Sequence, residues 1–377
     1  MNLSNLTLRN FRNYEKADLE FEHGIHLITG KNAQGKTNLL EAIAYLSTTR
    51  SHRTNDDQDM IQEGKDAFVL RASIHKHMKQ VELRAAVNEQ GKNLFLYRTP
   101  IKRVSNFIGE LNAVLFCPDD MSLFQASPKV RRRFIDMELS KLSKSYTRML
   151  NEAHKLLKER NACLKQDTID PTYLEVLTQQ LIEKQIVIIR QRHRFLIDLL
   201  ENCHTFYKDL SNDDTKLAFC YHSCVEYSEN EMELKQRLIK KYEKNKERDL
   251  FLKQTTTGFH KEDFMFLIND KEVSSYASQG QKRSVLLSMK IGMVSMIASL
   301  IHEYPVLLLD DVFSELDEYR KQKLLIALPK DVQIFITTTD VNEIPIIEDR
   351  RYILWNVDHG CITRETAEGG CNKWRKM

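Results

Sequence analysis

A run of glycines, a lysine and a threonine near the amino end of the chain has a spacing suited to binding phosphate. The run follows the pattern G-x-x-x-x-G-K-T and consists of Gly30, Lys31, Asn32, Ala33, Gln34, Gly35, Lys36 and Thr37. Its glycines allow the backbone to turn N–H groups inward around an anion. Lys36 can then reach the β- and γ-phosphates of ATP, and the Thr37 hydroxyl can coordinate Mg²⁺. We therefore predict an ATP site, in which Lys36 also serves catalysis.

The segments on either side of this loop predict the elements that position it. The apolar residues 25–28 indicate a short buried strand. Residues 38–46 place their leucines and isoleucine on one face of a helix. A strand, a glycine-rich loop and a helix form the context that this motif requires, and the helix N-terminus adds a positive dipole end. Asn38, which follows Thr37, is included in the predicted nucleotide site.

Two adjacent carboxylates in the last quarter of the chain are candidates for metal binding and catalysis. Asp310 and Asp311 follow the apolar run 306–309, which predicts a parallel strand buried on both faces. Asp310 fits the role of the strand-end aspartate that holds Mg²⁺ in P-loop ATPases. Asp311 occupies the position at which ABC-type ATPases usually carry a catalytic glutamate, and this resemblance implies that it orients the attacking water. Because aspartate is one methylene shorter, we expect slow hydrolysis.

A third motif precedes this strand and resembles the signature loop of ABC-type ATPases. Ser278, Gly280 and Gln281 stand at the start of a long helical pattern, with Gln279 in place of the usual first glycine. In ABC-type ATPases the comparable serine and backbone N–H groups meet the γ-phosphate held by the other subunit. The resemblance therefore implies that two copies close head-to-tail around ATP, with Ser278 taking part in catalysis.

Composition limits the compartment and the partners. The net charge is only +3, so a DNA-binding surface must come from local clustering of charge. The sequence contains no run of eighteen apolar residues and no basic segment followed by an apolar core at its start. Seven scattered cysteines favour free thiols in a reducing cytoplasm. Cys220 and Cys224 have no second pair at zinc spacing, so we do not expect a zinc site.

The motifs and the insert between them predict the domain organisation. We expect an α/β fold: an ABC-type ATPase head, with a P-loop NTPase core and an inserted, mainly helical second domain. Residues 1–115 and 300–377 should form the ATPase core, lobe I. Residues 116–299 should form the helical lobe II, which carries the signature motif. The apolar stripes between about 129 and 205 predict two or three helices in a compact antiparallel bundle rather than a long coiled coil.

Several segments together resemble the RecF family of bacterial DNA-repair ATPases related to SMC heads. They span nearly the whole chain: residues 8–14, 30–37, 50–54, 116–120, 128–136, 257–263 and 309–317. Ala126, Phe259 and Lys261 replace a usual glycine, proline and arginine. The strand over 332–337 ends in threonines and an aspartate, where ABC proteins often carry a histidine.

This resemblance implies a function in recombinational repair. It implies ATP-dependent binding of double-stranded DNA at gap junctions, ATP-dependent dimerisation, and weak DNA-stimulated ATP hydrolysis. The partners that it implies are RecR and RecO, with which the protein would help to load RecA at single-strand gaps, support replication restart and support SOS induction. Arg12, in the first motif, is the candidate for contacting adenine.

The residues that would contact DNA are left open by the sequence. Basic residues cluster at 129–133, 184–194, 235–253 and 50–53. Structural contacts, a solvated helix face and a mixed-charge helix are the simpler explanations of the first three clusters, whereas a satisfied loop explains the fourth about as well as contact with DNA does. No interleaving of basic and aromatic residues predicts a platform for single strands. We expect contacts to the phosphate backbone, with little reading of bases.

Two other functions are compatible with the motifs alone. One is an SMC-like ATPase head of another DNA-processing system, including a nuclease system of the overcoming-lysogeny type. The other is a transporter-type ABC subunit that drives a membrane partner. The long insert and the segments shared with the RecF family argue against the transporter, and we expect no membrane association.

Overall fold

The computed structural model describes residues 1–211 and 215–365. The chain forms two compact units. Unit 1 comprises Met1–Asp120, Asn202–Asp213 and Ser284–Met377, and unit 2 comprises Met121–Glu201 and Asp214–Arg283. The units are described separately below.

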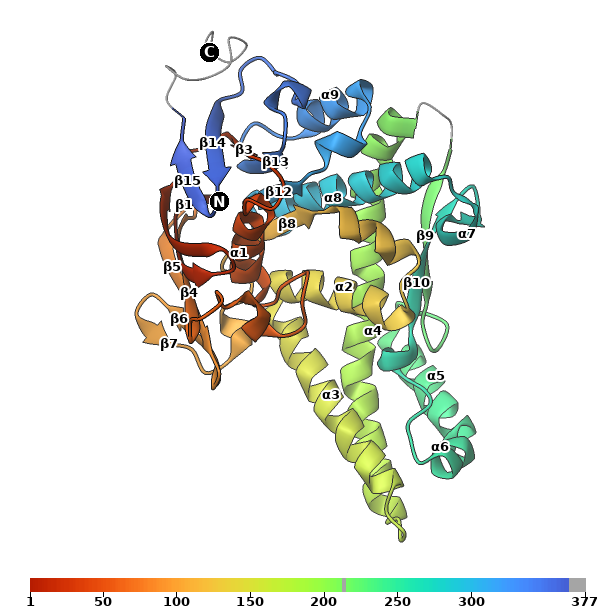
Figure 1. Cartoon of the computed structure of the whole chain (residues 1–377). Helices are drawn as coiled ribbons and strands as arrows, with labels where there is room; N and C mark the ends of the chain where they lie inside the picture. Colours follow the sequence, from red (N-terminus) through yellow and green to blue (C-terminus); the bar gives the residue numbers. More distant parts are fainter. Residues whose placement is uncertain (212–214, 366–377) are drawn as a thin grey trace. The chain divides into compact units, whose positions relative to one another are not determined.

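A mainly parallel sheet positions the predicted nucleotide motifs in unit 1 (Figure 1). Its strand order is β15-β14-β3-β13-β12-β8. The strands are β3 (Ile25–Thr29), β8 (Ala113–Phe116), β12 (Val306–Asp310), β13 (Ile334–Thr338), β14 (Tyr352–Asp358) and β15 (Cys361–Arg364). All neighbours are parallel except β14 and β15. The carboxyl ends of β3, β13 and β12 therefore lie at one edge of the sheet, and the loop after β3 meets Asp310 there.

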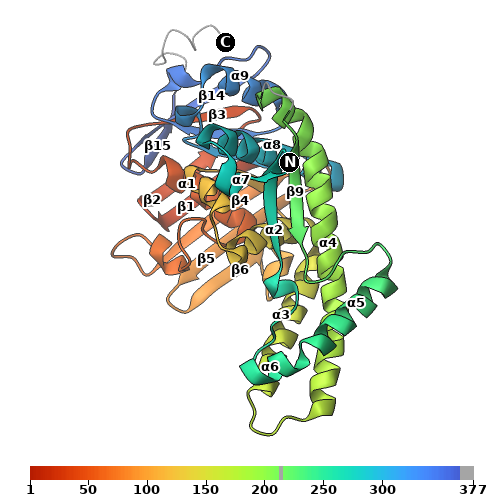
Figure 2. The ribbon, with the colours of Figure 1, turned by 90° about the vertical axis from the view of Figure 1, so that its right-hand side faces the viewer.

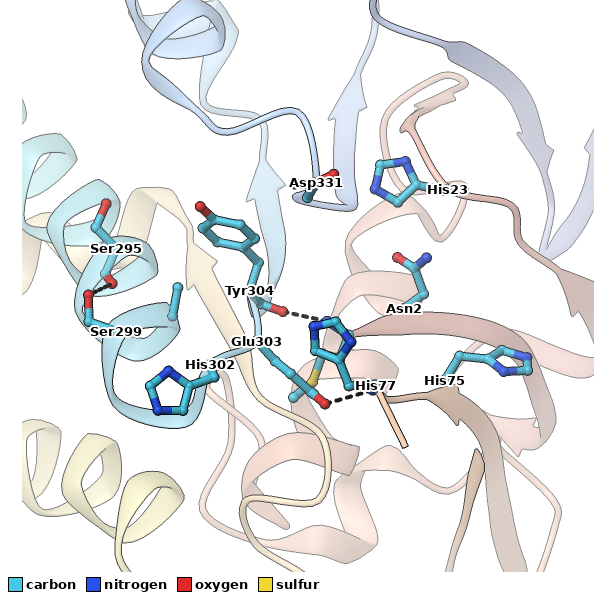
Figure 3. Close-up of a pocket in the computed structure, with 12 residues that line it drawn as sticks. Asn2, His23, His75, His77, Ser295, Ser299, His302, Glu303, Tyr304 and Asp331 are labelled. Atoms are coloured by element: carbon cyan, nitrogen blue, oxygen red, sulfur yellow. Dashed lines mark hydrogen bonds between the residues drawn. The ribbon is translucent and has the colours of Figure 1, made fainter. Parts of the chain in front are cut away.

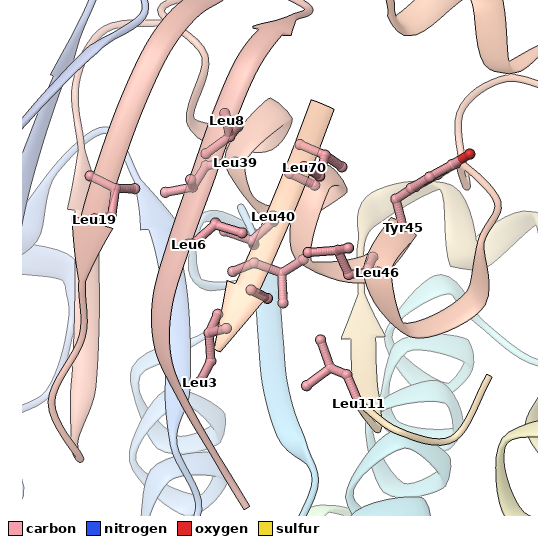
Figure 4. Packing of buried hydrophobic residues seen from close by; sticks show 14 of the residues in the cluster. Leu3, Leu6, Leu8, Leu19, Leu39, Leu40, Tyr45, Leu46, Leu70 and Leu111 are labelled. Carbon is pink, nitrogen blue, oxygen red and sulfur yellow. The ribbon is translucent and has the colours of Figure 1, made fainter. Parts of the chain in front are cut away.

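A second, antiparallel sheet covers helix α1 (Lys36–Thr48) in the same unit. Its order is β2-β1-β4-β5-β6-β7, formed by β1 (Asn2–Phe11), β2 (Tyr14–Glu20), β4 (Ala67–His75), β5 (Gln80–Asn88), β6 (Gly91–Leu96) and β7 (Thr99–Pro100). Alternate residues of β4 are buried, as the period of two requires. Strand β1 has a register shift between Leu3 and Asn5, and its buried residues are Leu3, Leu6, Leu8 and Phe11. Figure 4 shows Leu6, Leu8 and Leu70 from these strands packing against Leu39 and Leu40 of α1. This core fixes the helix that follows the phosphate loop.

Helices α8 (Gln279–Ile301) and α9 (Glu318–Ala327) follow the insert. Helix α8 is long and apolar enough to cross a membrane, but 72% of its most apolar window is buried inside the protein. Gly292 explains part of this packing, since a Cβ there would lie 2.6 Å from Cys203 Sγ. Burial in a protein core accounts for the composition of this helix. Four 3-10 turns lie in the described residues of unit 1: η1 (Asp57–Met60), η2 (Val104–Asn106), η5 (Phe313–Glu315) and η6 (Val341–Glu343). A further turn, η3 (Pro118–Phe124), begins in unit 1 and ends in unit 2.

Unit 2 is mainly helical (Figure 2). Its elements are α2 (Pro128–Leu142), α3 (Lys144–Leu164), the first part of α4 (Pro171–Ser211), β9 (Leu217–His222), α5 (Glu231–Lys244), α6 (Lys246–Leu252), η4 (Phe259–Lys261), β10 (Asp263–Ile268), β11 (Lys271–Glu272) and α7 (Val273–Tyr276). Helices α3 and α4 run side by side and share buried side chains, among them Leu164 and Leu177. Strands β11-β10-β9 form a small antiparallel sheet that the sequence did not predict.

The compact units differ from the predicted division at three segments. Residues 116–120, 202–213 and 284–299 belong to unit 1 rather than to the inserted unit. The reason is visible at α8, where Lys290 Nζ donates to Leu115 O and to Asp120 Oδ1. The signature motif at residues 278–281 starts α8, but the rest of the helix packs in unit 1 and therefore belongs to that unit. The division into lobes I and II remains a prediction about function.

Candidate nucleotide site

Glycines shape the loop that follows β3 through positive φ angles and close contacts. Gly30 has φ 146° and Gly35 has φ 119°, values that disfavour a side chain. A Cβ on Gly30 would lie 2.3 Å from Val357 O, and a Cβ on Gly35 would lie 2.6 Å from the Asn13 side chain. Ala33 also has a positive φ, of 65°. Both glycines are therefore needed for the turn itself and for the close packing of neighbouring segments.

Two segments distant in sequence brace the loop. Asn13 Nδ2 donates to Gln34 O at 2.6 Å, and the Tyr14 hydroxyl donates to Gly35 O at 3.0 Å. From the other end of the chain, the backbone N–H of Gly360 donates to the same Gln34 carbonyl at 3.1 Å. Asn38 Nδ2 donates to Asn13 Oδ1 at 2.8 Å, so Asn38 supports the brace. The sequence indicated a motif at residues 8–14 but not this role, because the contact depends on the tertiary fold.

Lys36 and Thr37 lie where the motif predicts them. Lys36 Nζ donates to Gly30 O at 2.7 Å and to Lys31 O at 2.9 Å, which holds the ammonium inside the loop. Burial lowers the pKa of Lys36, while the charges of Asp311 and Asp310 act in the opposite direction. The ammonium can exchange its carbonyl partners for phosphate oxygens without leaving the loop.

Asp310 accepts hydrogen bonds from hydroxyl groups of two neighbouring elements, α1 and β13. Its Oδ1 accepts from Thr37 Oγ1 at 2.9 Å and from Thr337 Oγ1 at 2.7 Å. A carboxylate and a threonine hydroxyl are hard oxygen donors of the kind that Mg²⁺ prefers. The donor set therefore fits Mg²⁺, and Thr37 and Asp310 remain its predicted ligands. Thr337 at the end of β13 was not predicted to be part of this cluster.

Asp311 adopts a left-handed backbone conformation, with φ 51°. Its N–H donates to Thr337 Oγ1 at 2.9 Å, and its carbonyl accepts from Ser314 Oγ at 2.8 Å. The chain thus turns sharply away from β12, and the Asp311 side chain is exposed at the carboxyl edge of the sheet. At the end of β13, Thr338 Oγ1 donates to Asp340 O and shapes the following turn.

Arg12, the candidate for contacting adenine, is partly buried and forms an ion pair with the fully buried Glu41 of α1. Its Nε and Nη2 donate to the two carboxylate oxygens at 2.9 and 2.8 Å, and its Nη1 donates to Asp59 O. Burial raises the pKa of Glu41, but hydrogen bonds from Arg12 and Ser51 outweigh it, and the pKa lies below its ordinary value. The guanidinium links α1 to the turn η1, and any contact with adenine would use its remaining N–H groups or its face.

Ser278 and Gln281 form a capping box at the start of α8. Ser278 Oγ accepts from Gln281 N at 3.2 Å, and Gln281 Oε1 accepts from Ser278 N at 2.9 Å. This reciprocal pair satisfies two backbone donors at the helix N-terminus. A serine hydroxyl has one proton and two lone pairs, so capping leaves the proton of Ser278 available to a ligand. Gly280 has open space around it.

The described residues that carry the predicted site therefore fall into two groups. Lys36, Thr37, Asp310 and Asp311 converge within unit 1, whereas residues 278–281 belong to unit 2. Each group is well formed by itself.

Most of the basic clusters considered for DNA contact have structural partners. Arg192 is buried and donates to Asp136 and Glu262, while Arg131 forms a bidentate pair with Asp263. Lys184 and Arg190 pair with acidic residues of neighbouring helices. The segment 235–253 forms two helices, α5 and α6, divided at Asn245. These arginines mainly hold unit 2 together.

Unit 1 also contains a hollow of about 780 Å³ lined by four histidines (Figure 3). His23, His75, His77 and His302 are spread around it, and Glu303 Oε1 accepts from the His77 backbone N–H. Within residues 1–211 and 215–365, no three His, Cys, Asp or Glu side chains are placed to hold a metal ion.

Comparison with known proteins identifies the family. Residues 2–362 match the family model of the RecF/RecN/SMC N-terminal domain. The DNA replication and repair protein RecF of Ligilactobacillus salivarius is 38% identical over 373 residues, covering 97% of this chain and 98% of that protein. The chain belongs to the RecF family. RecF of Halalkalibacterium halodurans is 37% identical over 371 residues, covering 97% of this chain and all of that protein (100%).

Solved structures agree with this assignment. The recombination mediator protein RecF of the RecFOR pathway, solved with ATP, matches with a TM-score of 0.88 and 31% identity over 97% of each chain. An SMC head bound to the winged-helix domain of ScpA matches with a TM-score of 0.55 at 16% identity, which shows the fold alone. The predicted RecF resemblance and the α/β ABC-type head with a helical insert are confirmed.

Proposed function

We propose that this RecF-family protein is an ATP-dependent, double-stranded DNA-binding protein of recombinational repair. The observation that carries the proposal is the convergence of Lys36, Thr37 and Asp310 at the carboxyl edge of the parallel sheet. The name of the RecF structure solved with ATP supports the choice of nucleotide. The names of the relatives support a role in DNA replication and repair.

The chain's own residues would bind and orient ATP. The N–H groups of residues 30–38 cradle the phosphates, and Lys36 compensates their charge. Thr37 and Asp310 would hold Mg²⁺, which supplies charge neutralisation at the β- and γ-phosphates when bound. Asp311 would orient the attacking water. Because its side chain is short, we expect slow hydrolysis that DNA accelerates.

Closure of a homodimer would complete the site. The free proton of Ser278, the backbone N–H of Gly280 and the side chain of Gln281 would contact the γ-phosphate held by a second copy. Since ATP stabilises only the closed state, its loss would open the dimer. We further propose RecO and RecR as partners, cytoplasmic localisation, and a role in loading RecA at single-strand gaps, in replication restart and in SOS induction.

Light scattering with ATP and Mg²⁺, with and without duplex DNA, tests this proposal. Lys36→Met should abolish both nucleotide binding and dimerisation, because it removes the charge that compensates the phosphates. Ser278→Arg should retain nucleotide binding and lose dimerisation. Ser278→Ala serves as a control for the added bulk, and we expect it to weaken dimerisation only partly. If Ser278→Arg still dimerised with ATP, the contact between subunits would be wrong.

A further inference from the structure

The more exposed face of the small sheet in unit 2 brings together a thiol, an imidazole and a thioether. Cys220 and His222 lie two residues apart on β9, so their side chains project from the same face. Met265 of β10 pairs directly with Cys220 in the antiparallel register and shares that face. Tyr221, between them on β9, points to the other face, where its hydroxyl donates to Glu262. Three side chains with nitrogen or sulfur donors therefore meet on one face of the sheet.

These donors are accessible, and two of them already touch. His222 is exposed and Cys220 and Met265 are half-buried, whereas Phe264 and Phe266, which flank Met265, are buried on the other face. Cys220 Sγ lies 3.5 Å from His222 Nε2. A metal ion bonded to sulfur at about 2.3 Å and to nitrogen at about 2.0 Å, at a tetrahedral or trigonal angle, holds the two atoms about 3.5–3.7 Å apart. The pair therefore has the separation that a shared metal ion needs, without rearrangement of β9.

The other potential ligands beside these three side chains are engaged elsewhere. Asp263, which pairs with His222 across the strands, accepts two hydrogen bonds from Arg131. Cys224 Sγ accepts from Gln185 Nε2 at 2.9 Å, and burial raises the pKa of the Cys224 thiol. The carboxylate and the second thiol that a zinc site would recruit are thus occupied. What is left is a soft set of one thiol, one imidazole and one thioether.

We propose that Cys220, His222 and Met265 form a binding site for a monovalent copper ion, Cu(I). Thiolate and thioether sulfur are the donors that select Cu(I), and imidazole also suits copper. On binding, the Cys220 thiol releases its proton to solvent and its sulfur lone pair forms the bond to the metal, with no change of oxidation state. The negative charge of the thiolate then balances the single positive charge of Cu(I). A divalent ion would leave a net positive charge on a half-buried surface.

Methionine is what completes this site. Within the described residues no three His, Cys, Asp or Glu side chains could hold a metal ion, and Cys220 with His222 alone gives only two donors. The thioether comes from a strand more than forty residues further along the chain, so the sequence shows only the Cys-x-His half. The three ligands belong to unit 2 and include no residue of the predicted nucleotide site.

Anaerobic titration of the full chain with Cu(I), in competition with a chromogenic Cu(I) chelator, tests the proposal. The wild-type protein should take one equivalent of Cu(I) from the chelator, and Cys220→Ser should lose that equivalent. His222→Gln and Met265→Leu keep the thiol and should each weaken the binding by about tenfold or more. X-ray absorption of the complex should show two sulfur neighbours and one nitrogen neighbour of copper, with one sulfur missing in Met265→Leu.

Matched controls remove the same kinds of side chain elsewhere. Cys361→Ser removes an exposed thiol of β15, and Met232→Leu removes a thioether that is 73% exposed on α5. Both should bind Cu(I) within about twofold of wild type, because these positions are independent of the site. Circular dichroism melting of each metal-free variant checks that the fold is retained.

Three outcomes would overturn the proposal. Wild-type affinity in both His222→Gln and Met265→Leu would mean that a thiol alone accounts for the binding. A loss in Cys361→Ser equal to that in Cys220→Ser would place the copper elsewhere. Displacement of Cu(I) by an equimolar amount of Zn²⁺ would show that the set does not prefer a soft monovalent ion.

Discussion

At the scale of single residues, Thr337 links the two carboxylates of the proposed ATPase site. Its hydroxyl donates to Asp310 Oδ1 and accepts from the Asp311 N–H. One side chain therefore fixes both the orientation of the proposed Mg²⁺ ligand and the sharp turn that directs Asp311. The sequence could not reveal this role, because threonine is common in strands and the register of β13 against β12 decides which threonine faces Asp310.

We expect Thr337→Val to lower stability by about 1–3 kcal/mol, because a buried N–H and a buried carboxylate each lose a partner. Steady-state ATP hydrolysis should fall more than ATP affinity, since the phosphate loop keeps its own contacts. Thr338→Val is the matched control. It removes a similarly buried hydroxyl from the same strand, one that donates to Asp340 O. Equal effects of the two substitutions on hydrolysis would show that Thr337 has no special position.

His26 is a buried residue whose protonation state depends on its surroundings. Its Nδ1 accepts from Trp355 Nε1 at 3.0 Å, so its Nε2 carries the proton and donates to Glu22 O at 2.9 Å. Burial lowers the pKa of His26 from 6.5 to about 4. A proton on Nδ1 would face the indole N–H, and the neutral form is therefore the one that fits the folded protein.

The depressed pKa of His26 predicts a loss of stability in acid. Between pH 6.5 and about 4, His26 is protonated in the unfolded chain but not in the folded chain. The contribution of His26 to the free energy of unfolding is therefore fully present above pH 6.5, and it falls by up to about 3 kcal/mol as the pH falls to 4. Denaturant unfolding of wild type and His26→Gln across this range measures the effect. The variant should be less stable at pH 7 but have a flatter pH dependence; parallel curves would assign the acid sensitivity to other groups.

At the scale of elements, the sequence predicted those whose pattern is local. The strand before the phosphate loop, the helix after it and the strand ending at Asp310 are present as β3, α1 and β12. Apolar runs next to a glycine motif leave few alternatives for such segments. The helical character of the insert was also predicted, but α4 is one helix of 41 residues, longer than the apolar stripes suggested.

Elements fixed by distant contacts were missed. Strands β9 and β10 lie more than forty residues apart in sequence and pair only through the tertiary fold. The mixed-charge segment 235–253 suits a single helix by its charge pattern, but the structure has two helices there, because Asn245 ends α5 and precedes α6. Its side chain donates to Lys241 O, a local bond that competes with continuation of the helix.

At the scale of the whole molecule, the near balance of charge makes clustered surfaces decisive. With a net charge of only +3, duplex binding must depend on local arginines and lysines rather than on the overall field. The basic clusters in unit 2 are largely paired, so their charge is compensated within the fold. Exposed cations without partners are the better candidates for contact with phosphate.

We expect duplex binding in the presence of ATP and Mg²⁺ to fall steeply with salt and to depend little on sequence. Each phosphate contact should contribute a slope of about −0.9 in log K against log salt concentration. Filter binding or anisotropy between low and moderate salt, with two unrelated duplexes of equal length, measures both properties. An affinity that does not change with salt would exclude a surface built on phosphate contacts, and a large preference for one duplex would indicate base reading.

The contacts that brace the phosphate loop also determine when, during synthesis, the loop can reach its final conformation. Residues 30–37 leave the ribosome early, but Val357 and Gly360, which pack against Gly30 and Asn13, leave it more than three hundred residues later. A nascent or truncated chain lacking these residues would contain the complete motif without its support. Tight nucleotide capture would therefore begin only after Gly360 has been synthesised, so shorter nascent chains would not compete for nucleotide or trap completed partners.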